Sequence, residues 1–352
     1  MKLTTVFFTV LFLFLSYAKL FGMSCHLSSL FLKCISLKAS DVHLSASSKP
    51  WLRIDGDLRQ LEEEPLFSDQ DLENMLFVIM PDGAKEVFAK NFSVDFAYPI
   101  NSEYRLRANV FRCSKGIAAV FRFISNSILS IEQLNLPRIL ETFALLKSGL
   151  LLVTGPTGSG KSTTLASLVD YINHNRACHI ITIEDPIEFV YQSQKSLISQ
   201  RQIGKDAVSF SEALKNALRE DPDILLVGEL RDLETIRLAL TAAETGHLVL
   251  ATLHTISAAQ TITRIVDVFP GSEQPLVRVM LAETLRAVVS QVLCKKKEGG
   301  RIAATEILVV NPAISNLIRE NKTMQIYSQM QMGSQHGMHT LEQSRKKIMN
   351  YE

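Results

Sequence analysis

The sequence predicts an α/β protein in which a small α+β domain precedes a larger domain built on a parallel sheet. Short segments that alternate apolar and polar residues, typical of half-buried antiparallel strands, occupy residues 39–125. From residue 149 onward, continuous apolar segments alternate with amphipathic helical ones, the pattern of parallel strands joined by helical crossovers. The chain has 352 residues, 47% of them hydrophobic, which is enough for two such domains.

The change of pattern along the chain predicts four segments. These are a signal-like segment or upstream extension at residues 1–22, an N-terminal α+β domain at 23–125, a linker at 126–148, and a C-terminal domain with a helical end at 149–352. The linker is expected because Ser125–Leu140 combines polar turn residues with a proline and separates the two patterns.

The N-terminal domain is expected to hold a mostly antiparallel sheet and a helix. A strand at Asp41–Ala46 precedes a hairpin within Trp51–Leu61, because Asp55 and Gly56 tolerate the positive φ angles of a two-residue turn. A capping box and an apolar stripe predict a helix that begins after Ser68. Further strands are expected at residues 93–98, 104–111 and 118–124.

One of these strands carries a polar stripe. Because side chains alternate between the two faces of a strand, Arg105, Arg107 and Asn109 share a face, and Arg122 on the neighbouring strand can enlarge it. The stripe is either a site for an anion or an ordinary solvent-facing surface, and the pattern alone leaves both open.

Five apolar segments predict the strands of the C-terminal domain. Amphipathic helical stretches lie between them, and one of these is supported by a capping box at Ser209 and Glu212 and another by Gly246 at its end. We expect a sheet covered by helices on both faces. The segments are LLLVTG, HIITIED, DILLVGE, HLVLATLH and RIAATEILVV.

A phosphate-binding loop follows the first of these strands. The segment GPTGSGKST matches G-x-x-x-x-G-K-[ST], and it lies between a buried strand and an amphipathic helix, as this motif requires. Backbone N–H groups and the helix N-terminus would hold phosphate, Lys161 would contact the β- and γ-phosphates of ATP, and Ser162 would ligate Mg²⁺. The nucleotide-binding residues are Gly155, Pro156, Thr157, Gly158, Ser159, Gly160, Lys161, Ser162 and Thr163.

Acidic residues end two further strands of the same predicted sheet. Glu184 and Asp185 close one strand, and Glu229 closes another, followed by Arg231 and Asp232. Carboxylates at these positions can orient an attacking water and approach the metal, because the carboxyl ends of parallel strands meet at one edge. In isolation such acids could also be solvated turns.

Two histidines flank the strand HLVLAT. His254 follows it at the carboxyl end beside Thr252 and Thr255, which favours a role in sensing the γ-phosphate or relaying a proton. His247 precedes the strand, where a structural role and a functional role are equally supported.

Charge and cysteine content exclude several other classes of protein. Lysine and arginine (37) nearly balance aspartate and glutamate (36), so the basic surface expected of a nucleic-acid-binding protein is missing. The five cysteines are scattered without a C-x-x-C pair, which argues against a zinc site or a disulfide framework and favours reduced thiols.

Taken together, these segments resemble the secretion ATPases of type II secretion systems and type IV pili. The specific signature is LREDPDILLVGELRD at Leu218–Asp232, supported by ASDVHLSA, ITIEDPIEF and GHLVLATLHT, and the likeness covers residues 38–342. Within the family, the chain is most similar to the motors that retract type IV pili.

The resemblance implies a RecA-like ATPase domain preceded by a PAS-like domain, with ATP between the two and a hexameric ring. It assigns the acidic box to Glu184 and Asp185, the Walker B glutamate to Glu229, and the histidine box to His254 with His247. By the same likeness Arg105 and Arg107 would approach the phosphates as the domains close. Glu184 is then the expected general base, and Ser162, Glu229 and Asp185 the groups near Mg²⁺.

Three departures from the family pattern qualify this expectation. The four-cysteine zinc element of assembly motors is absent, since only Cys294 follows His254. The segment AISNLIRE at Ala313–Glu320 resembles the AIRNLIRE motif of retraction motors, with Ser315 in place of arginine. The short charged end SRKKIMNYE replaces a longer helical tail, and we expect it to weaken ring packing or motor output.

The function expected from the resemblance is a homo-hexameric, Mg²⁺-dependent ATPase that retracts a type IV pilus and so drives twitching motility. Its partner would be the platform protein of the pilus in the inner membrane, which the motor meets at the cytoplasmic face, and nucleic acid is not expected as a partner. The alternatives are a pilus-assembly or type II secretion ATPase, a regulatory module that binds ATP without hydrolysing it, and a RecA-like DNA motor.

The first residues conflict with this cytoplasmic location. Lys2 precedes an apolar run from Leu3 to Ala18, which is typical of a secretory signal and shorter than the roughly 20 residues of a membrane span. A motor that uses cytosolic ATP cannot work after export. We therefore expect residues 1–22 to be an upstream extension, with Met23 as the natural start and a membrane anchor as the alternative.

Overall fold

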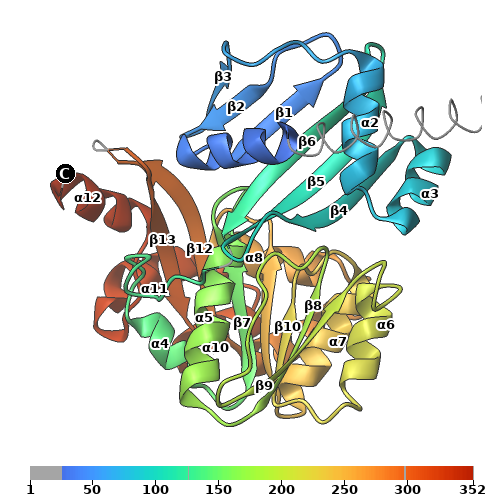
Figure 1. The fold of residues 1–352 in the computed structure, drawn as a ribbon. Helices are drawn as coiled ribbons and strands as arrows, with labels where there is room; N and C mark the ends of the chain where they lie inside the picture. Colours follow the sequence, from blue (N-terminus) through green and yellow to red (C-terminus); the bar gives the residue numbers. More distant parts are fainter. Residues whose placement is uncertain (1–25, 126, 297–298, 352) are drawn as a thin grey trace, which may run out of the picture. The chain divides into compact units, whose positions relative to one another are not determined.

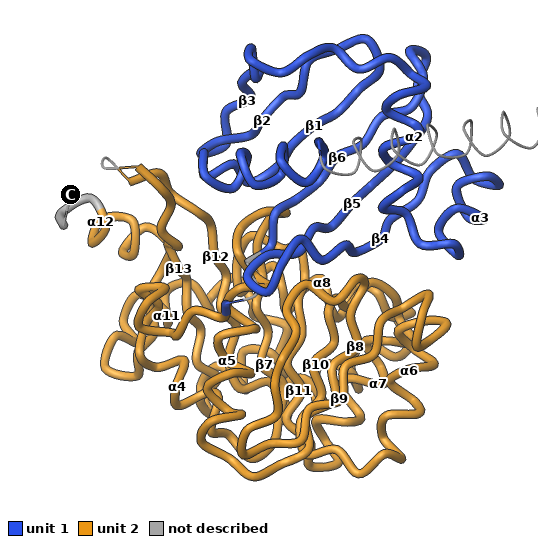
Figure 2. Tube along the Cα trace, viewed as in Figure 1, with its two compact units in different colours: residues 1–127 blue, residues 128–352 orange. Residues whose placement is uncertain are grey.

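The computed structural model describes residues 26–125, 127–296 and 299–351. The predicted upstream extension and Met23 lie outside these described residues. The chain divides into two compact units, unit 1 (Met1–Ser127) and unit 2 (Ile128–Glu352), which Figure 2 shows in blue and orange. Each unit is described by itself.

Unit 1 contains an antiparallel six-stranded sheet in the order β3-β2-β1-β6-β5-β4. Residues 26–36 form a helix, and two more helices follow in the chain. The bounds are β1 Asp41–Ser45, β2 Trp51–Ile54, β3 Asp57–Gln60, α2 Asp69–Ile79, α3 Asp82–Asn91, β4 Ser93–Pro99, β5 Tyr104–Cys113 and β6 Gly116–Ser125.

The local predictions for unit 1 are confirmed. Asp55 and Gly56, both with positive φ, form the turn between β2 and β3. The hydroxyl of Ser68 accepts a hydrogen bond from the Asp71 N–H at the start of α2. Leu72 and Leu76 of that helix are fully buried in a single core with Phe121 of β6. The prediction of a small α+β unit with an antiparallel sheet therefore holds.

Unit 2 contains a mixed seven-stranded sheet in the order β13-β12-β7-β11-β10-β8-β9 (Figure 1). The strands from β12 to β9 in this order are parallel, and β13 pairs with β12 in the antiparallel sense. The strand bounds are β7 Gly149–Thr154, β8 His179–Glu184, β9 Leu197–Gln202, β10 Ile224–Val227, β11 Leu248–Leu253, β12 Leu285–Lys295 and β13 Arg301–Val309.

Helices cover both faces of this sheet. Their bounds are α4 Ile139–Ala144, α5 Lys161–Asn175, α6 Phe210–Ala217, α7 Leu233–Glu244, α8 Ala258–Asp267, α9 Gln274–Thr284, α10 Pro312–Arg319, α11 Ile326–Met332 and α12 Leu341–Tyr351, with 3₁₀ turns at Thr323–Gln325 and Gly333–His336. The N-cap predicted at Ser209 is present at the start of α6, where the Ser209 hydroxyl accepts a hydrogen bond from the Glu212 N–H.

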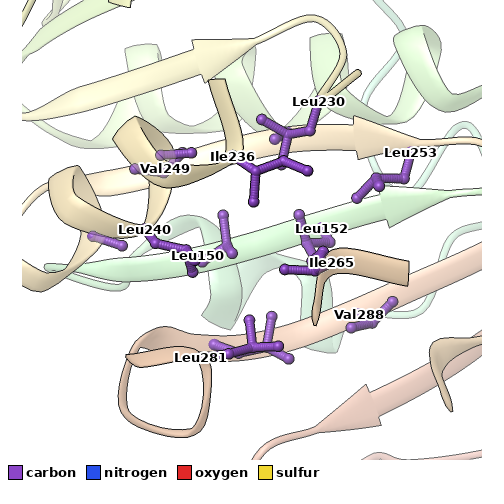
Figure 3. Close-up of a cluster of buried hydrophobic side chains, with 14 of the residues drawn as sticks. Leu150, Leu152, Leu230, Ile236, Leu240, Val249, Leu253, Ile265, Leu281 and Val288 are labelled. Atoms are coloured by element: carbon purple, nitrogen blue, oxygen red, sulfur yellow. The ribbon is translucent and has the colours of Figure 1, made fainter. Parts of the chain in front are cut away.

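Two separate cores result from the alternation of side chains along the strands. Leu150 and Leu152 of β7 belong to one core, where Figure 3 shows them among Ile236 and Leu240 of α7 and Leu281 of α9. The intervening residues of β7 point into the other core, which packs against α4 and α5. Burial on both faces explains why the sheet strands are continuous apolar segments.

Two features of unit 2 differ from the sequence-based prediction. The segment RIAATEILVV, expected in the parallel set, is the antiparallel edge strand β13, because only a short connection joins it to β12 and a parallel pairing needs a long crossover. The predicted linker at 126–148 includes Ile131, Leu136 and Leu140, which are buried in the core with α5. Residues 128–148 therefore pack as part of unit 2.

Among the described residues, no helix combines the length and the apolar character needed to span a membrane.

Candidate functional site

The glycine-rich loop between β7 and α5 has a conformation that its glycines make possible. Gly155, Gly158 and Gly160 have φ angles of 142°, 76° and 88°, values that residues with a Cβ atom rarely adopt. At Gly155 space is limiting as well, because a Cβ atom would lie 2.3 Å from the carbonyl oxygen of Gln291. The loop therefore approaches β12 closely and turns its backbone toward the start of α5.

The loop ends in a buried lysine. The Lys161 Nζ donates hydrogen bonds to the carbonyl oxygens of Gly155 (2.8 Å) and Pro156 (3.1 Å). Burial lowers the pKa of the Lys161 ammonium, and the nearby carboxylates of Glu229 and Glu188 act in the opposite direction. The loop thus surrounds a desolvated cation, which attracts an anionic ligand.

The first turn of α5 supplies further groups for an anion. The first N–H groups of a helix have no acceptor within the helix, and here they belong to Lys161, Ser162 and Thr163. The Ser162 side chain is exposed, whereas the Ser159 hydroxyl is buried and has no hydrogen-bond partner among the described residues. An orphaned hydroxyl inside a phosphate-binding loop fits a site whose ligand oxygens complete its hydrogen bonds.

The sequence reasoning missed a residue that fixes this loop, Gln291 of β12. Gln291 is 1% exposed, and its Nε2 donates to the Ser159 carbonyl (2.7 Å) while its Oε1 accepts from the Thr164 hydroxyl (2.9 Å). The signal was a polar pair, Ser290 and Gln291, inside an otherwise apolar strand. Ser290 bonds the hydroxyl of Thr154 at the end of β7 (2.7 Å).

Glu184 lies at the carboxyl end of β8. Its Oε1 accepts hydrogen bonds from the Thr182 hydroxyl (2.7 Å) and the Gln200 Nε2 (3.3 Å). Burial raises the pKa of the Glu184 carboxyl to about 7, although these hydrogen bonds favour the charged form. A carboxylate with this pKa can take up a proton near neutral pH.

Glu229 follows β10 and is the centre of a polar chain. Its Oε2 accepts from the Arg231 side chain at 2.8 Å, and its Oε1 lies 3.3 Å from the His254 Nε2. The Nδ1 of His254 lies 3.5 Å from the hydroxyl of Thr157 in the glycine-rich loop. His254 therefore connects this loop to Glu229.

The remaining predicted residues of unit 2 fall into three groups. Asp185 follows Glu184 in the chain and is exposed. Asp232 caps α7 by accepting from the Thr235 N–H (2.9 Å) and hydroxyl (2.8 Å), which is a structural role. His247 lies at the opposite end of β11 from His254, where its Nδ1 is 3.0 Å from the Ala242 carbonyl oxygen. Of the two roles left open for His247, this position favours the structural one.

The predicted arginine stripe is present in unit 1. Arg105, Arg107 and Asn109 lie on the face of β5 opposite the buried residues Leu106 and Ala108. Both arginines take part in polar or electrostatic interactions.

Acidic residues share this face of the unit 1 sheet. Arg122 of β6 pairs directly with Arg107 across the strands and donates from Nε to the buried Asp41 (2.9 Å). The Nε of Arg107 is 3.8 Å from Asp95. The stripe is thus a mixed surface in which the cations outnumber the neighbouring acids.

The arrangement in unit 2 has the parts of a nucleotide-hydrolysing site. The glycine-rich loop follows β7, Glu184 ends β8, and Glu229 and His254 follow β10 and β11, so all four lie at the carboxyl edge of one sheet. Hydroxyl and carboxylate oxygens are suitable ligands for Mg²⁺, which usually combines one or two carboxylates with phosphate and water.

Comparison with known proteins gives concordant similarities. A profile of the family described as "Type II/IV secretion system protein" matches residues 24–351. The chain is 52% identical over 311 residues to "Type IV pilus retractation ATPase PilT" of Pseudomonas aeruginosa, a match that covers 88% of this chain and 90% of that protein. It is also 52% identical over 301 residues to "Twitching motility protein" of Neisseria gonorrhoeae, covering 85% and 80% of the two chains.

A solved structure supports the same relationship. The structure described as "Crystal Structure of the Pilus Retraction Motor PilT and Bound ADP" superposes with a TM-score of 0.82 at 46% sequence identity, covering 92% of this chain and 93% of that chain.

Proposed function

The chain belongs to the type II/IV secretion system protein family, and from this premise we propose that it is an ATP-hydrolysing motor that retracts a type IV pilus. The observation that carries the proposal is the convergence of the glycine-rich loop, Glu184, Glu229 and His254 at one edge of the unit 2 sheet. The names of the two relatives and the ADP bound to the similar structure support the same function.

The glycine-rich loop and the start of α5 bind the phosphates. Backbone N–H groups of the loop and the buried Ser159 hydroxyl donate to phosphate oxygens. Lys161 leaves the carbonyl oxygens of Gly155 and Pro156 for the β- and γ-phosphates, an exchange that costs little because both arrangements satisfy its donors.

The Ser162 hydroxyl, together with Glu229 and Asp185, would hold Mg²⁺. When bound, the metal neutralises charge that develops on the phosphate oxygens. Glu229 has two tasks in this proposal, because it also holds the His254 side chain that contacts the loop at Thr157. His254 thereby reports on whether the phosphate position is filled.

Glu184 acts as the general base. The attacking water must lose a proton as it forms a bond to the γ-phosphorus, and a carboxylate whose pKa is near the working pH accepts that proton well. Arg105 and Arg107 of unit 1 stabilise the negative charge on the transferred phosphoryl group when the two domains close.

The assembly and partners belong to the same proposal. We propose residues 23–125 as a PAS-like N-terminal domain, a homo-hexameric ring as the working form, and the platform protein of the pilus at the inner membrane as the partner. Sedimentation of the purified chain with an ATP analogue tests the hexamer directly.

Complementation tests the proposed function. A retraction-deficient strain is transformed with this chain or with Lys161→Ala, and twitching and surface pili are scored. We expect the unaltered chain alone to restore twitching. Loss of pili in a strain that lacks this protein would instead support an assembly or secretion ATPase, and nucleotide binding without phosphate release would support a regulatory module.

A further inference from the structure

The catalytic edge of the sheet includes β9, a strand that the proposed function does not use. β9 pairs with β8 in parallel register, with Thr182 beside Gln200 and Glu184 beside Gln202. Because side chains two residues apart share a face, Thr182 and Glu184 lie on one face of β8, and Gln200 and Gln202 lie on the matching face of β9.

Two side chains from these strands hold one oxygen of Glu184. The Thr182 hydroxyl and the Gln200 Nε2 both donate to Oε1, at 2.7 Å and 3.3 Å, and the backbone N–H of Glu188 adds a third hydrogen bond to the carboxylate. Thr182 is fully buried and Gln200 is half-buried. Donors of this kind restrict the rotation of a carboxylate that has left bulk water.

Gln200 also ties the carboxylate to the loop after β8. Its Nε2 donates to the Phe189 carbonyl (2.8 Å), and its Oε1 accepts from the Tyr191 N–H (2.9 Å). The same amide group therefore fixes both Glu184 and the backbone that runs past it. Few side chains other than glutamine offer a donor and an acceptor at this reach.

We propose that Gln200 and Thr182 are positioning residues that orient the Glu184 carboxylate toward the attacking water. This inference rests on the proposed function, because it requires Glu184 to act on the water. Neither residue bonds a group of the glycine-rich loop, so their effect is on the rate of the chemical step and not on nucleotide binding.

Substitution of each residue in two backgrounds tests the inference. Thr182→Val and Gln200→Met keep the side-chain volume and remove the donors. In the otherwise unaltered full-length chain, we expect kcat for ATP hydrolysis to fall by about 10-fold or more, with KM and the affinity for ADP within about 2-fold. In the Glu184→Gln background, the same substitutions should change the residual single-turnover rate by less than about 2-fold, since the group they orient is gone.

A neighbouring glutamine provides the matched control. Gln202 lies on the same face of β9 and its Oε1 accepts from the Ile187 N–H (3.3 Å), so Gln202→Met disturbs the same loop without removing a donor to Glu184. We expect it to leave kcat within about 3-fold.

Three results would overturn the inference. They are an equal loss of rate in both backgrounds, a loss that lies in KM or ADP affinity, and a loss in Gln202→Met as large as in Gln200→Met. The last two would indicate that these side chains stabilise the loop after β8 as a whole and do not specifically orient Glu184. Unchanged turnover in Glu184→Gln itself would refute the proposed role of Glu184, and that failure is distinguishable because it appears in the single variant.

Discussion

At the scale of single residues, the site contains two glutamates whose environments differ. Glu184 is held by uncharged donors, and burial raises its pKa to about 7. Glu229 instead pairs with the Arg231 guanidinium at 2.8 Å and lies 3.3 Å from the His254 Nε2. The surroundings of Glu184 thus suit it to accept a proton, whereas Glu229 is tied to the side chains of Arg231 and His254.

The raised pKa of Glu184 has a consequence for stability. Because the folded protein holds this proton more tightly than the unfolded chain, unfolding becomes easier as pH rises from about 4.5 to about 7. Glu184→Gln cannot ionise and escapes this loss. We compare the free energy of unfolding of the two proteins without nucleotide and with a chelator present. Between pH 5 and pH 8, we expect this free energy to rise in the variant relative to the unaltered chain by at most about 3 kcal/mol.

Denaturant titration of both proteins at the two pH values gives this difference. A constant difference in unfolding free energy across the range would show that the Glu184 carboxyl titrates normally in the folded protein.

At the scale of elements, the glycine-rich loop depends on a strand distant in the sequence. Gln291 of β12 holds the Ser159 carbonyl and the Thr164 hydroxyl, and its own backbone leaves no room for a side chain at Gly155. The loop is therefore shaped from one side by β12 and from the other by the start of α5.

Removal of this support should weaken nucleotide binding. Gln291→Leu leaves the buried Ser159 carbonyl and Thr164 hydroxyl without this partner, and each loss costs about 1–3 kcal/mol. Part of this cost destabilises the loop conformation that binds nucleotide. We expect the affinity for a fluorescent ADP analogue to fall by roughly 10-fold. Gln260→Leu, at an exposed position on α8, is the control and should bind as the unaltered chain does.

The elements also show where sequence patterns reach their limit. The strands β7, β8, β10 and β11 were predictable because continuous apolar runs occur where both faces are buried. Strand β9 was missed because its sequence, LISQRQ, has no continuous apolar run. It lies at the edge of the sheet and carries polar residues on the face that holds Glu184. Strand β12 was also missed, and one reason is that Ser290 and Gln291 interrupt its apolar run.

At the scale of the whole molecule, each unit has its own sheet and core, and the predicted site residues are shared between them. Lys161, Glu184, Glu229 and His254 belong to unit 2, whereas Arg105 belongs to unit 1 with Arg107. Hydrolysis in the proposed mechanism therefore requires both units.

Substitution in unit 1 tests this requirement. We expect Arg107→Ala to lower kcat for ATP hydrolysis by about 10-fold or more while ADP binding to unit 2 changes little, because the lost charge acts on the transition state. Arg53→Ala is the matched control, since Arg53 lies in the same sheet and donates to the Gly56 carbonyl in its own hairpin (2.7 Å). Equal activity of the two variants would remove Arg107 from the mechanism.

The candidate site was predictable to the extent that motifs mark strand ends. The carboxyl ends of strands brought Glu184, Glu229 and His254 together because parallel strands share that edge. His247 lies at the amino end of the same strand, as the sequence predicted, and therefore at the opposite edge of the sheet from His254. Gln200 could not be found, because its role follows from the register of β9 beside β8.

Phosphate release by the purified full-length chain tests the central claim most directly, measured with Mg²⁺ and ATP for the unaltered protein and for Glu184→Gln. The account predicts steady hydrolysis by the unaltered chain and a rate lower by on the order of 10²-fold or more in the variant, which should still bind a fluorescent ADP analogue. Equal turnover by the two proteins, or the absence of hydrolysis by the unaltered chain in its assembled form, would contradict it.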